Sequence, residues 1–240
     1  MSQFWYNDET SNLLAMEAIS LGGTRQAGQH ARIACVSCPS IFQAIKRLNP
    51  PDTEYVILEY DTRFEVYGKK FFQYDFNNPT YLPEELYHTF DFVVADPPYL
   101  NKDCMSKTGL TMSFLAKNSK TPSLFNTGLV MERDIYVVLN LRRCEFEPQH
   151  ERNLANQFCT YSNYQSQALG KWHAIPKRPR KTVQRKPETA TEQATATAET
   201  EQKRVSGSGS ATAQVTTGES SEAAEAASVS APTEAASVVS

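Results

Sequence analysis

The chain has 240 residues, a formal net charge of −3 and a hydrophobic content of 40%, which makes a general nucleic-acid binder a poor default interpretation. No apolar stretch approaches the ~18 residues that a membrane span needs, and the first residues, MSQFWYNDETS, do not resemble a signal peptide. The five cysteines are odd in number and scattered, which favours reduced thiols in a cytoplasmic or nuclear protein.

Composition divides the chain into two parts. The 12 Phe, 11 Tyr and 2 Trp all lie at or before Trp172, and the later residues are mainly Ala, Thr, Ser, Glu and Gln. Such a segment buries too little apolar surface to offset the entropy of ordering its backbone. We therefore expect one folded domain over residues 1–172, and a disordered basic linker and low-complexity tail over residues 173–240.

The linker is basic. KWHAIPKRPRKTVQRK, residues 171–186, contains seven Lys or Arg and no acid. We favour a solvated linker that keeps the tail extended. The alternatives are a nuclear-import signal over residues 176–186, which would give a nuclear pool beside a cytoplasmic one, and an auxiliary contact with RNA.

The folded part begins with helices and strands that alternate. A helix is predicted over residues 8–23, where Asp, Thr and Ser can cap the start and a Gly pair follows. Residues 39–49 form a second predicted helix, which Pro50 ends. Strands are predicted in this half over residues 31–36, 54–60, 70–75 and 91–95. A short helix is predicted over residues 83–90, before the last of these strands.

The second half continues the pattern. A helix is predicted over residues 101–118, a strand over 122–128 and a helix over 128–143, followed by strands over 144–149 and 158–164. Alternation of helices with strands that are apolar throughout predicts an α/β fold with a mostly parallel sheet covered on both faces. The closing strand pair predicts one antiparallel edge strand.

Open α/β sheets bind ligands at the carboxyl ends of their strands. Three of the first four predicted strands end in acids: LEYD after the second, QYD after the third and ADPPY after the fourth. These ends are therefore the candidate site.

The fourth end is the most informative. Pro97 and Pro98 cannot donate to a sheet ladder and hold Asp96 in an extended conformation, so the chain leaves the sheet with its oxygen atoms fixed. Fixed acceptors beside the ring of Tyr99 suit an NH₂ or NH₃⁺ group. The alternative is a proline-rich loop in which Asp96 caps the next helix.

Asp96-Pro97-Pro98-Tyr99 resembles the (Asn/Asp)-Pro-Pro-(Tyr/Phe) signature of amino-group methyltransferases that use S-adenosylmethionine. Six blocks between residues 2 and 164 are similar to one family, first labelled N6-adenine DNA methyltransferases, which includes the enzymes that methylate a lysine of translation elongation factor 1-alpha. The blocks are SQFWY, CVSCPSIF, LEYDTRF, YDFNNP, FDFVVADPPYL and HERNLANQFCTYSNY. The resemblance does not extend to the tail.

The resemblance implies a seven-strand Rossmann-like class I methyltransferase fold and S-adenosylmethionine as cofactor. Asp96, Pro97 and Tyr99 would form the catalytic motif. Glu59, with Asp61 as the alternative, would accept hydrogen bonds from the cofactor ribose. Asp75 would face the adenine, whose ring would pack on Phe76 or Tyr74.

The loop after the first strand departs from many methyltransferases, because CVSCPS has no glycine. The resembled family shares this departure, so Ser37 and backbone amides near Ser40 would contact the cofactor. Cys35 and Cys38 form a C-x-x-C without a second pair or nearby histidines, and we expect no metal there.

Two other segments are candidate parts of the site. Trp5 and Tyr6 precede the first helix and either pack on the core or form a lid over the cofactor. Arg152, Asn153 and Asn156, between the last strands, lie on the expected substrate side, where Arg152 would pair with an acidic substrate residue or satisfy loop carbonyls.

The tetrapeptide does not choose between lysine and adenine, because both present an amino group to the same acceptors. The acidic domain, the absence of a recognisable nucleic-acid module and the matching blocks favour a protein substrate, elongation factor 1-alpha. An N6-adenine RNA or DNA methyltransferase is the alternative, and a non-catalytic methyltransferase-like binding module is the third hypothesis. The sequence does not specify the oligomeric state.

Overall fold

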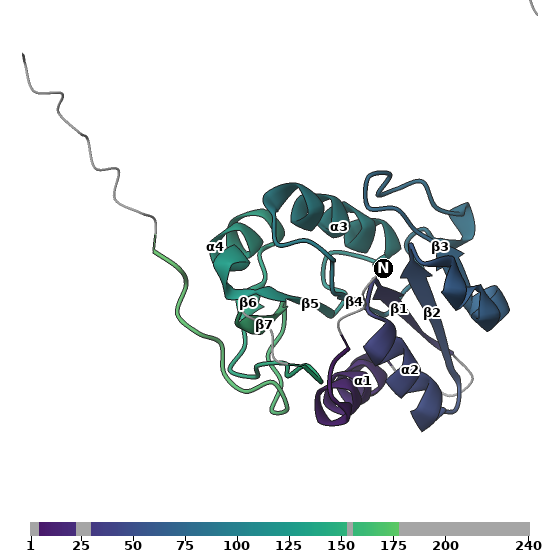
Figure 1. The fold of residues 1–240 in the computed structure, drawn as a ribbon, viewed down its shortest axis with the longest axis horizontal. Helices are drawn as coiled ribbons and strands as arrows, with labels where there is room; N and C mark the ends of the chain where they lie inside the picture. The colour runs from purple at the N-terminus through teal and green to yellow at the C-terminus, as the bar shows by residue number, and fades with distance from the viewer. Residues whose placement is uncertain (1–4, 23–29, 153–155, 178–240) are drawn as a thin grey trace, which may run out of the picture. The chain divides into compact units, whose positions relative to one another are not determined.

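A computed structural model of the protein describes residues 5–22, 30–152 and 156–177. Its centre is a seven-stranded sheet in the order β3-β2-β1-β4-β5-β7-β6 (Figure 1). The strands are β1 (Ala31–Val36), β2 (Thr53–Glu59), β3 (Phe71–Gln73), β4 (Phe92–Ala95), β5 (Ser123–Gly128), β6 (Arg142–Arg143) and β7 (Phe158–Ser162).

The sheet is mostly parallel. The strands β1 to β5 pair in parallel, and β7 runs antiparallel to both β5 and β6. The expected α/β class with a mostly parallel sheet is confirmed, and the antiparallel strand is β7, one position in from the edge strand β6. The strand order reverses between β1 and β4, which is where open sheets of this kind form a crevice.

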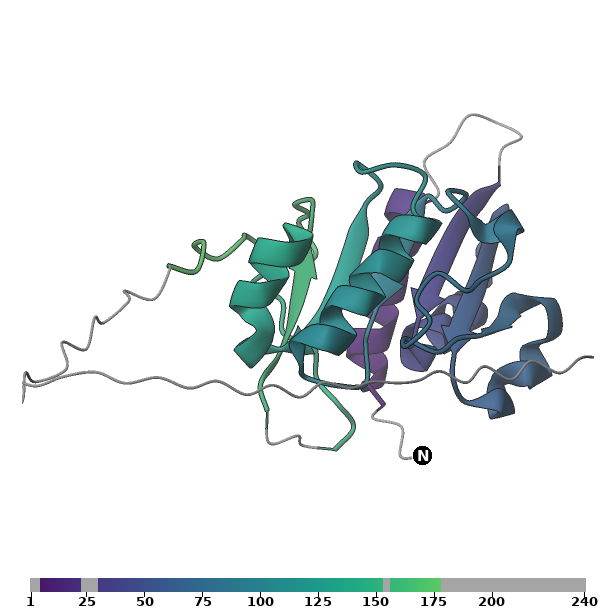
Figure 2. The ribbon, with the colours of Figure 1, turned by 90° about the horizontal axis from the view of Figure 1, so that it is seen from above.

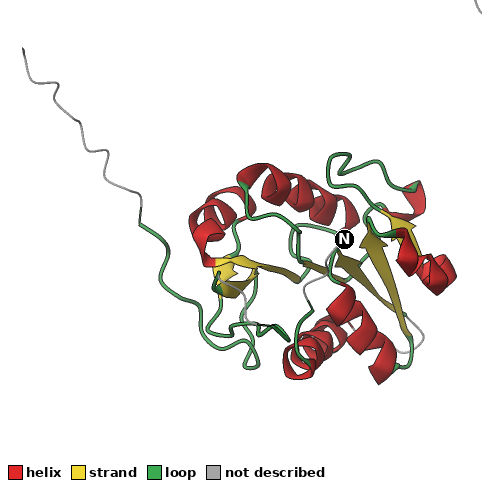
Figure 3. Cartoon of the chain, in the orientation of Figure 1, coloured by secondary structure: helices red, strands yellow, loops and turns green. Residues whose placement is uncertain are grey.

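Helices cover both faces of the sheet (Figures 1 and 3). One face carries α1 (Asp8–Gly22) and α2 (Pro39–Leu48), and the other carries α3 (Lys102–Leu115) and α4 (Glu132–Asp134). A 3-10 helix, η1 (Thr62–Lys70), connects β2 to β3. None of the helices in the described ranges is long and apolar enough to cross a membrane.

The two-sided cover explains why the strands are apolar at nearly every position. In β1, Ile33 and Cys35 pack with α1 and α2, whereas Ala34 and Val36 pack on the other face with α3. Since side chains alternate between the faces of a strand, both sets must be apolar when both faces are covered.

The helix expected over residues 83–90 is wrong. Only a 3-10 turn forms, over Glu84–Leu86, and His88 has a positive φ of 54°. The backbone amides of His88 and Phe90 instead donate to carbonyls at the end of α3, at 2.8 and 3.0 Å. These tertiary hydrogen bonds replace the ones that a continued helix would make.

The last predicted elements are also corrected. The helix expected over residues 128–143 is broken into a 3-10 turn, the short α4 and a π-helical turn (Ile135–Leu139), and it ends at Asn140 in a left-handed conformation. The strand expected over 144–149 is wrong, because the ladder residues are Arg142–Arg143. The amides of Glu145 and Phe146 donate to Lys171 and Leu169 instead.

The described chain continues beyond Trp172 to Lys177. The Arg142 guanidinium donates to the carbonyl of His173 at 3.1 Å and stacks over the Trp172 ring, 4.5 Å from its centroid. Arg133 donates to the carbonyl of Lys177 at 3.0 Å. The rest of the predicted linker and tail, residues 178–240, lies outside the described residues.

The helix that follows the Asp96–Tyr99 motif begins with a side-chain cap. Asn101 Oδ1 accepts a hydrogen bond from the amide of Cys104 at 2.9 Å. We expect Asn101→Ala to lower the free energy of unfolding by about 1 kcal/mol, because an orphan amide loses its partner. Urea unfolding measures the loss, and Asn101→Ser is the matched control that should retain most of the stability. An equal loss in both variants would contradict the capping role.

Candidate active site at the carboxyl ends of the strands

The ends of β1, β2, β4 and β5 meet along one edge of the sheet. The segment that enters α1 and the loop that precedes β7 lie at this same edge (Figure 2). Both segments are joined by their backbones, because Asn7 donates to the carbonyl of Gln149 and Glu151 donates to the carbonyl of Trp5, each at 2.9 Å. Chain segments that are far apart in the sequence therefore lie together at this edge.

Asp96 lies at the centre of this edge. Its amide donates to the carbonyl of Val36 at 3.0 Å, which continues the pairing of β4 with β1 by one residue. Pro97 is buried, and Pro98 and Tyr99 are exposed. Because Asn101 caps α3, Asp96 is not the helix cap, and the alternative of a capping role for its carboxylate is excluded.

The environment of Asp96 is unfavourable to its charge. Burial raises its pKa to about 7, a hydrogen-bond contribution from Tyr6 opposes this rise, and the nearby charge of Glu59 adds to it. The residue as a whole is partly accessible to solvent. An acid whose pKa lies near neutral pH has the properties of a proton acceptor.

Tyr6 and Asn126 are next to Asp96. The Tyr6 side chain is 3% exposed and the Asn126 side chain lies on buried β5 at 0%. The pKa of Tyr6 is raised, first by burial and then by the charge of Asp96. Tyr6 is one of the sequence-predicted candidates, as a residue of the core or of a lid, whereas Asn126 is not among them. An asparagine at the end of the apolar run SLFNTG was the available signal.

The end of β2 supplies two acids with different partners. Glu59 is 7% exposed, and its Oε1 accepts from the amides of Tyr60 and Asp61 at 3.0 and 3.3 Å. Asp61 forms a bidentate ion pair with Arg63, whose Nε lies 2.9 Å from Oδ2, and Arg63 holds the pKa of Asp61 down at about 2. Glu59 and Asp96 end strands on either side of β1, and the charge of Glu59 adds to the raised pKa of Asp96.

The two aromatic candidates after the end of β3, Tyr74 and Phe76, differ in their burial. Tyr74 is 2% exposed and its hydroxyl is 2.9 Å from that of Thr111, so it is a core residue under α3. Phe76 is partly exposed and meets the ring of Tyr99 edge to face, with centroids 5.6 Å apart. Asp75, which lies between these two residues, accepts a hydrogen bond from the amide of Asn77 at 2.9 Å.

The loop after β1 adopts the conformation that glycine usually provides. Ser37 has a φ of 52°, in the left-handed region that favours glycine, and its amide donates to the carbonyl of Leu58 at 2.8 Å. The following helix, α2, starts at Pro39 with no side-chain cap. Ser40 does not face outward: its hydroxyl accepts the amide of Tyr6 at 3.1 Å.

The cysteines of this loop are packing residues. Cys35 and Cys38 are buried thiols, and Cys38 Sγ contacts the carbonyl of Val94 at 3.5 Å. Within the described ranges no cluster of three or more His, Cys, Asp or Glu could hold a metal ion.

Two of the three candidate substrate residues lie on the surface of the loop before β7. Arg152 and Asn156 are exposed, and Asn153 lies outside the described residues. Trp5 is partly buried against the core, and its carbonyl accepts from Glu151, so the loop and the amino-terminal segment are adjacent.

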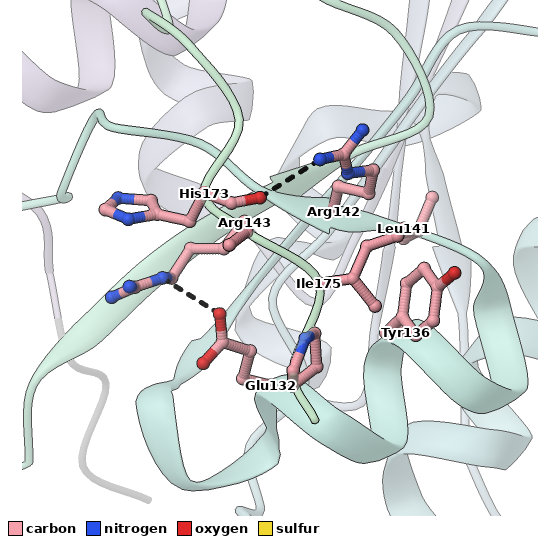
Figure 4. A pocket seen from close by; sticks show the side chains of 9 residues that line it. Glu132, Tyr136, Leu141, Arg142, Arg143, His173 and Ile175 are labelled. Carbon is pink, nitrogen blue, oxygen red and sulfur yellow. Dashed lines mark hydrogen bonds and ion pairs between the residues drawn. The ribbon is translucent and has the colours of Figure 1, made fainter. Parts of the chain in front are cut away.

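A pocket elsewhere in the fold has different chemistry (Figure 4). It lies between α4, β6 and the segment 173–176, and its walls include a Glu132–Arg143 ion pair with 3.1 Å between Oε1 and Nε. The pocket contains none of the strand-end residues Glu59, Asp75 or Asp96. It is therefore separate from the candidate active site.

Known proteins match this chain over the folded part. A family model described as "Probable N6-adenine methyltransferase" matches residues 1–166. EEF1A lysine methyltransferase 1 of Gallus gallus is 49% identical over 167 residues, which is 69% of this chain and 75% of that protein. The Danio rerio protein of the same name is 46% identical over 173 residues, 70% and 99% of the two chains.

A more distant relative, Protein-lysine N-methyltransferase M142.8 of Caenorhabditis elegans, is 37% identical over 170 residues, 69% of this chain and 78% of that protein. The family model, over residues 1–166, covers every strand and the Asp96–Tyr99 motif. The chain therefore belongs to the methyltransferase family that this model describes, whose named relatives here are protein-lysine N-methyltransferases.

Proposed function

We propose that this protein transfers a methyl group from S-adenosylmethionine to a lysine side chain of translation elongation factor 1-alpha. The observation that carries the proposal is the enclosed Asp96 carboxylate at the end of β4, in a chain whose relatives are named for this substrate. The carboxylate is placed to receive an amino group, and it titrates in the range where it can also take a proton from one.

The strand ends fit the cofactor. When bound, S-adenosylmethionine supplies an activated methyl group. Glu59 would accept hydrogen bonds from the ribose, because Asp61 is already engaged by Arg63. Phe76 would pack against the adenine with Tyr99 beside it, since Tyr74 is turned into the core.

The turn after β1 completes the cofactor fit. The left-handed backbone of Ser37 and the uncapped start of α2 present amide groups at the same edge. Amides at a helix start favour a negatively charged group, such as the carboxylate of the methionine part.

Lysine must lose a proton before its nitrogen has a lone pair. With a pKa of ~10.4, only about one lysine in a thousand is neutral near pH 7.4, which is equivalent to ~4 kcal/mol. The Asp96 carboxylate first accepts hydrogen bonds from the ammonium group and then accepts one proton at an oxygen atom. Its raised pKa brings it closer to the pKa of lysine than an ordinary aspartate would be.

Adenine N6 methylation is the second candidate, and the description of the matching family model favours it. The adenine amino group is already neutral, so it needs an acceptor to orient it but no base with a raised pKa. The two candidates therefore differ in what they require from Asp96.

The first prediction concerns Asp96→Asn. Asparagine keeps an acceptor oxygen but cannot take a proton near neutral pH, so we expect a loss of at least about 100-fold in kcat on elongation factor 1-alpha. Methyl transfer from labelled cofactor measures it, with Asp96→Ala as the comparison that removes both roles. Activity near that of the wild type in Asp96→Asn would contradict proton acceptance by Asp96.

The second prediction is that Asp96→Asn is more stable than the wild type at alkaline pH. Between the ordinary value of 3.8 and about 7, the folded protein holds a proton on Asp96 that the unfolded chain has lost. Stability therefore falls as pH rises through this window, and the penalty persists above it. We expect Asp96→Asn to raise Tm by about 8–16 °C at pH 8, from a gain of ~4 kcal/mol, and to have little effect at pH 4. An equal change at both values would contradict the titration.

The third prediction concerns the cofactor. Glu59→Gln removes the charge of the carboxylate but keeps its size, and we expect it to weaken S-adenosylmethionine binding by roughly tenfold or more, because hydrogen bonds to a charged acceptor are the stronger ones. Calorimetry measures the affinity. Asp61→Asn is the matched control, and a larger loss in that variant than in Glu59→Gln would move the ribose contact to Asp61.

The substrate is tested by incubating the full chain and labelled S-adenosylmethionine with purified elongation factor 1-alpha, total RNA or DNA. We expect label on a lysine of the protein alone. Label on adenine in either nucleic acid, with none on the protein, would overturn the proposed substrate.

A further inference from the structure

Polar side chains meet on one face of the sheet where β4 and β5 end. Ala95 pairs with Phe125, so Asp96 lies beside Asn126 one step further along the two strands. Because side chains alternate along strands, Asp96 and Asn126 share one face of the sheet, the face against which Tyr6 packs. Three chain segments therefore bring three polar groups together.

Two of these groups have donors without a partner. Within the described residues, Tyr6 Oη and Asn126 Nδ2 are buried and make no hydrogen bond of ordinary geometry, although Tyr6 is near enough to Asp96 to lower its pKa. A buried donor left unpaired costs about 1–3 kcal/mol. Such groups are rare in folded proteins, and where they occur together at a site they indicate a functional role or a missing partner.

The orientation of the Asn126 side chain is set by a hydrogen bond from the neighbouring strand. The Thr160 hydroxyl, on the neighbouring strand β7, donates to Asn126 Oδ1 at 2.9 Å. With its oxygen engaged, the amide has Nδ2 left as a donor, and a hydrogen-bond contribution from Asn126 lowers the pKa of Tyr6. An amide nitrogen can only donate, so in a bond between the two the Tyr6 oxygen would accept, which would leave the Tyr6 proton for Asp96.

Tyr6 is held from several sides. Its amide donates to Ser40 Oγ at 3.1 Å, and its backbone bridges to that of His150. The rings of Tyr6 and His150 lie with centroids 4.6 Å apart. These contacts fix a residue from outside the sheet near Asp96, where each group affects the pKa of the other.

We propose that Tyr6 and Asn126 are positioning residues, and that the chain Thr160–Asn126–Tyr6 directs a hydroxyl proton at the Asp96 carboxylate. In this arrangement the Tyr6 hydroxyl binds one carboxylate oxygen of Asp96, and the other oxygen remains for the substrate amine. The inference rests on the proposed function for its role in lysine methylation, but the positions of Tyr6 and Asn126 beside Asp96 can be tested without a substrate.

The chain counteracts the surroundings of the carboxylate. The titratable groups that face Asp96 from the described elements are Tyr6, Cys38 at the start of α2 and Glu59 at the end of β2. Burial and the charge of Glu59 raise the pKa of Asp96, and Tyr6 is the group that lowers it. Without the Tyr6 hydroxyl, the carboxylate would be protonated over a wider pH range and could not accept a proton from lysine.

The fourth prediction tests the hydrogen-bond chain without activity. In full-length protein labelled with ¹³C at the aspartate carboxyl carbon, NMR titration follows Asp96, which is assigned by its absence in Asp96→Asn. We expect Tyr6→Phe to move the Asp96 midpoint upward by about one pH unit, and Asn126→Leu to move it in the same direction by less, because Asn126 acts through Tyr6. An unchanged midpoint in Tyr6→Phe would overturn the inference.

Tyr161→Phe is the matched control. Tyr161 is also a buried tyrosine whose hydroxyl has no partner within the described residues, but the charged groups around it are Glu132 and Arg143. We expect it to leave the Asp96 midpoint and kcat unchanged. A midpoint that moves equally in both tyrosine variants would show a general loosening of the fold and would also overturn the inference.

Kinetics supply the functional arm of the same test. If the midpoint moves from about 7 to about 8, kcat on elongation factor 1-alpha falls about fivefold at pH 7 and recovers above pH 9, with KM for the cofactor unchanged. A loss that is equal at every pH would assign Tyr6 a structural role only. Wild-type protein that shows the expected titration but no methylation of this substrate would refute the proposed function and leave the hydrogen-bond chain standing.

Discussion

The structure depends on one arrangement, a carboxylate held at the end of a buried parallel strand. Asp96 continues the pairing of β4 with β1 through its amide, and the two prolines after it prevent the chain from continuing in the sheet. The backbone is thereby fixed where the carboxylate enters the crevice. Burial and the proximity of Glu59 then raise its pKa to about 7, so that geometry and electrostatics act on the same group.

This arrangement opposes the stability of the fold. An acid with a raised pKa makes the folded state less stable above neutral pH, and Tyr6 and Asn126 add buried donors without partners beside it. The cores on the two faces of the sheet, with fully buried residues such as Phe92 and Phe125, must offset these costs. Concentrating unfavourable groups at one edge of an otherwise apolar sheet is typical of a catalytic site.

The sequence was sufficient for the parts of the fold that local patterns determine. Apolar strand patterns and the start and stop signals of helices predicted β1 to β5, β7, α1, α2 and α3. Elements that depend on distant partners were not predictable: the amides of His88 and Phe90 donate to the end of α3, and those of Glu145 and Phe146 donate to residues 171 and 169. For the site, the acids at the strand ends could be found from the sequence. Asn126 and the position of Tyr6 required the register of β4 against β5 and the path of the amino-terminal segment.

The difference between lysine and adenine as substrates is reflected in the charge state of the acceptor. A neutral amino group is oriented equally well by an asparagine or an aspartate oxygen, so an enclosed acid near another acid would be an unnecessary cost. A charged lysine needs a group that binds it as a cation and then removes one of its protons. A carboxylate that titrates near neutral pH, with a tyrosine hydroxyl that opposes its protonation, meets both requirements. The surroundings of Asp96, more than the tetrapeptide itself, therefore favour lysine.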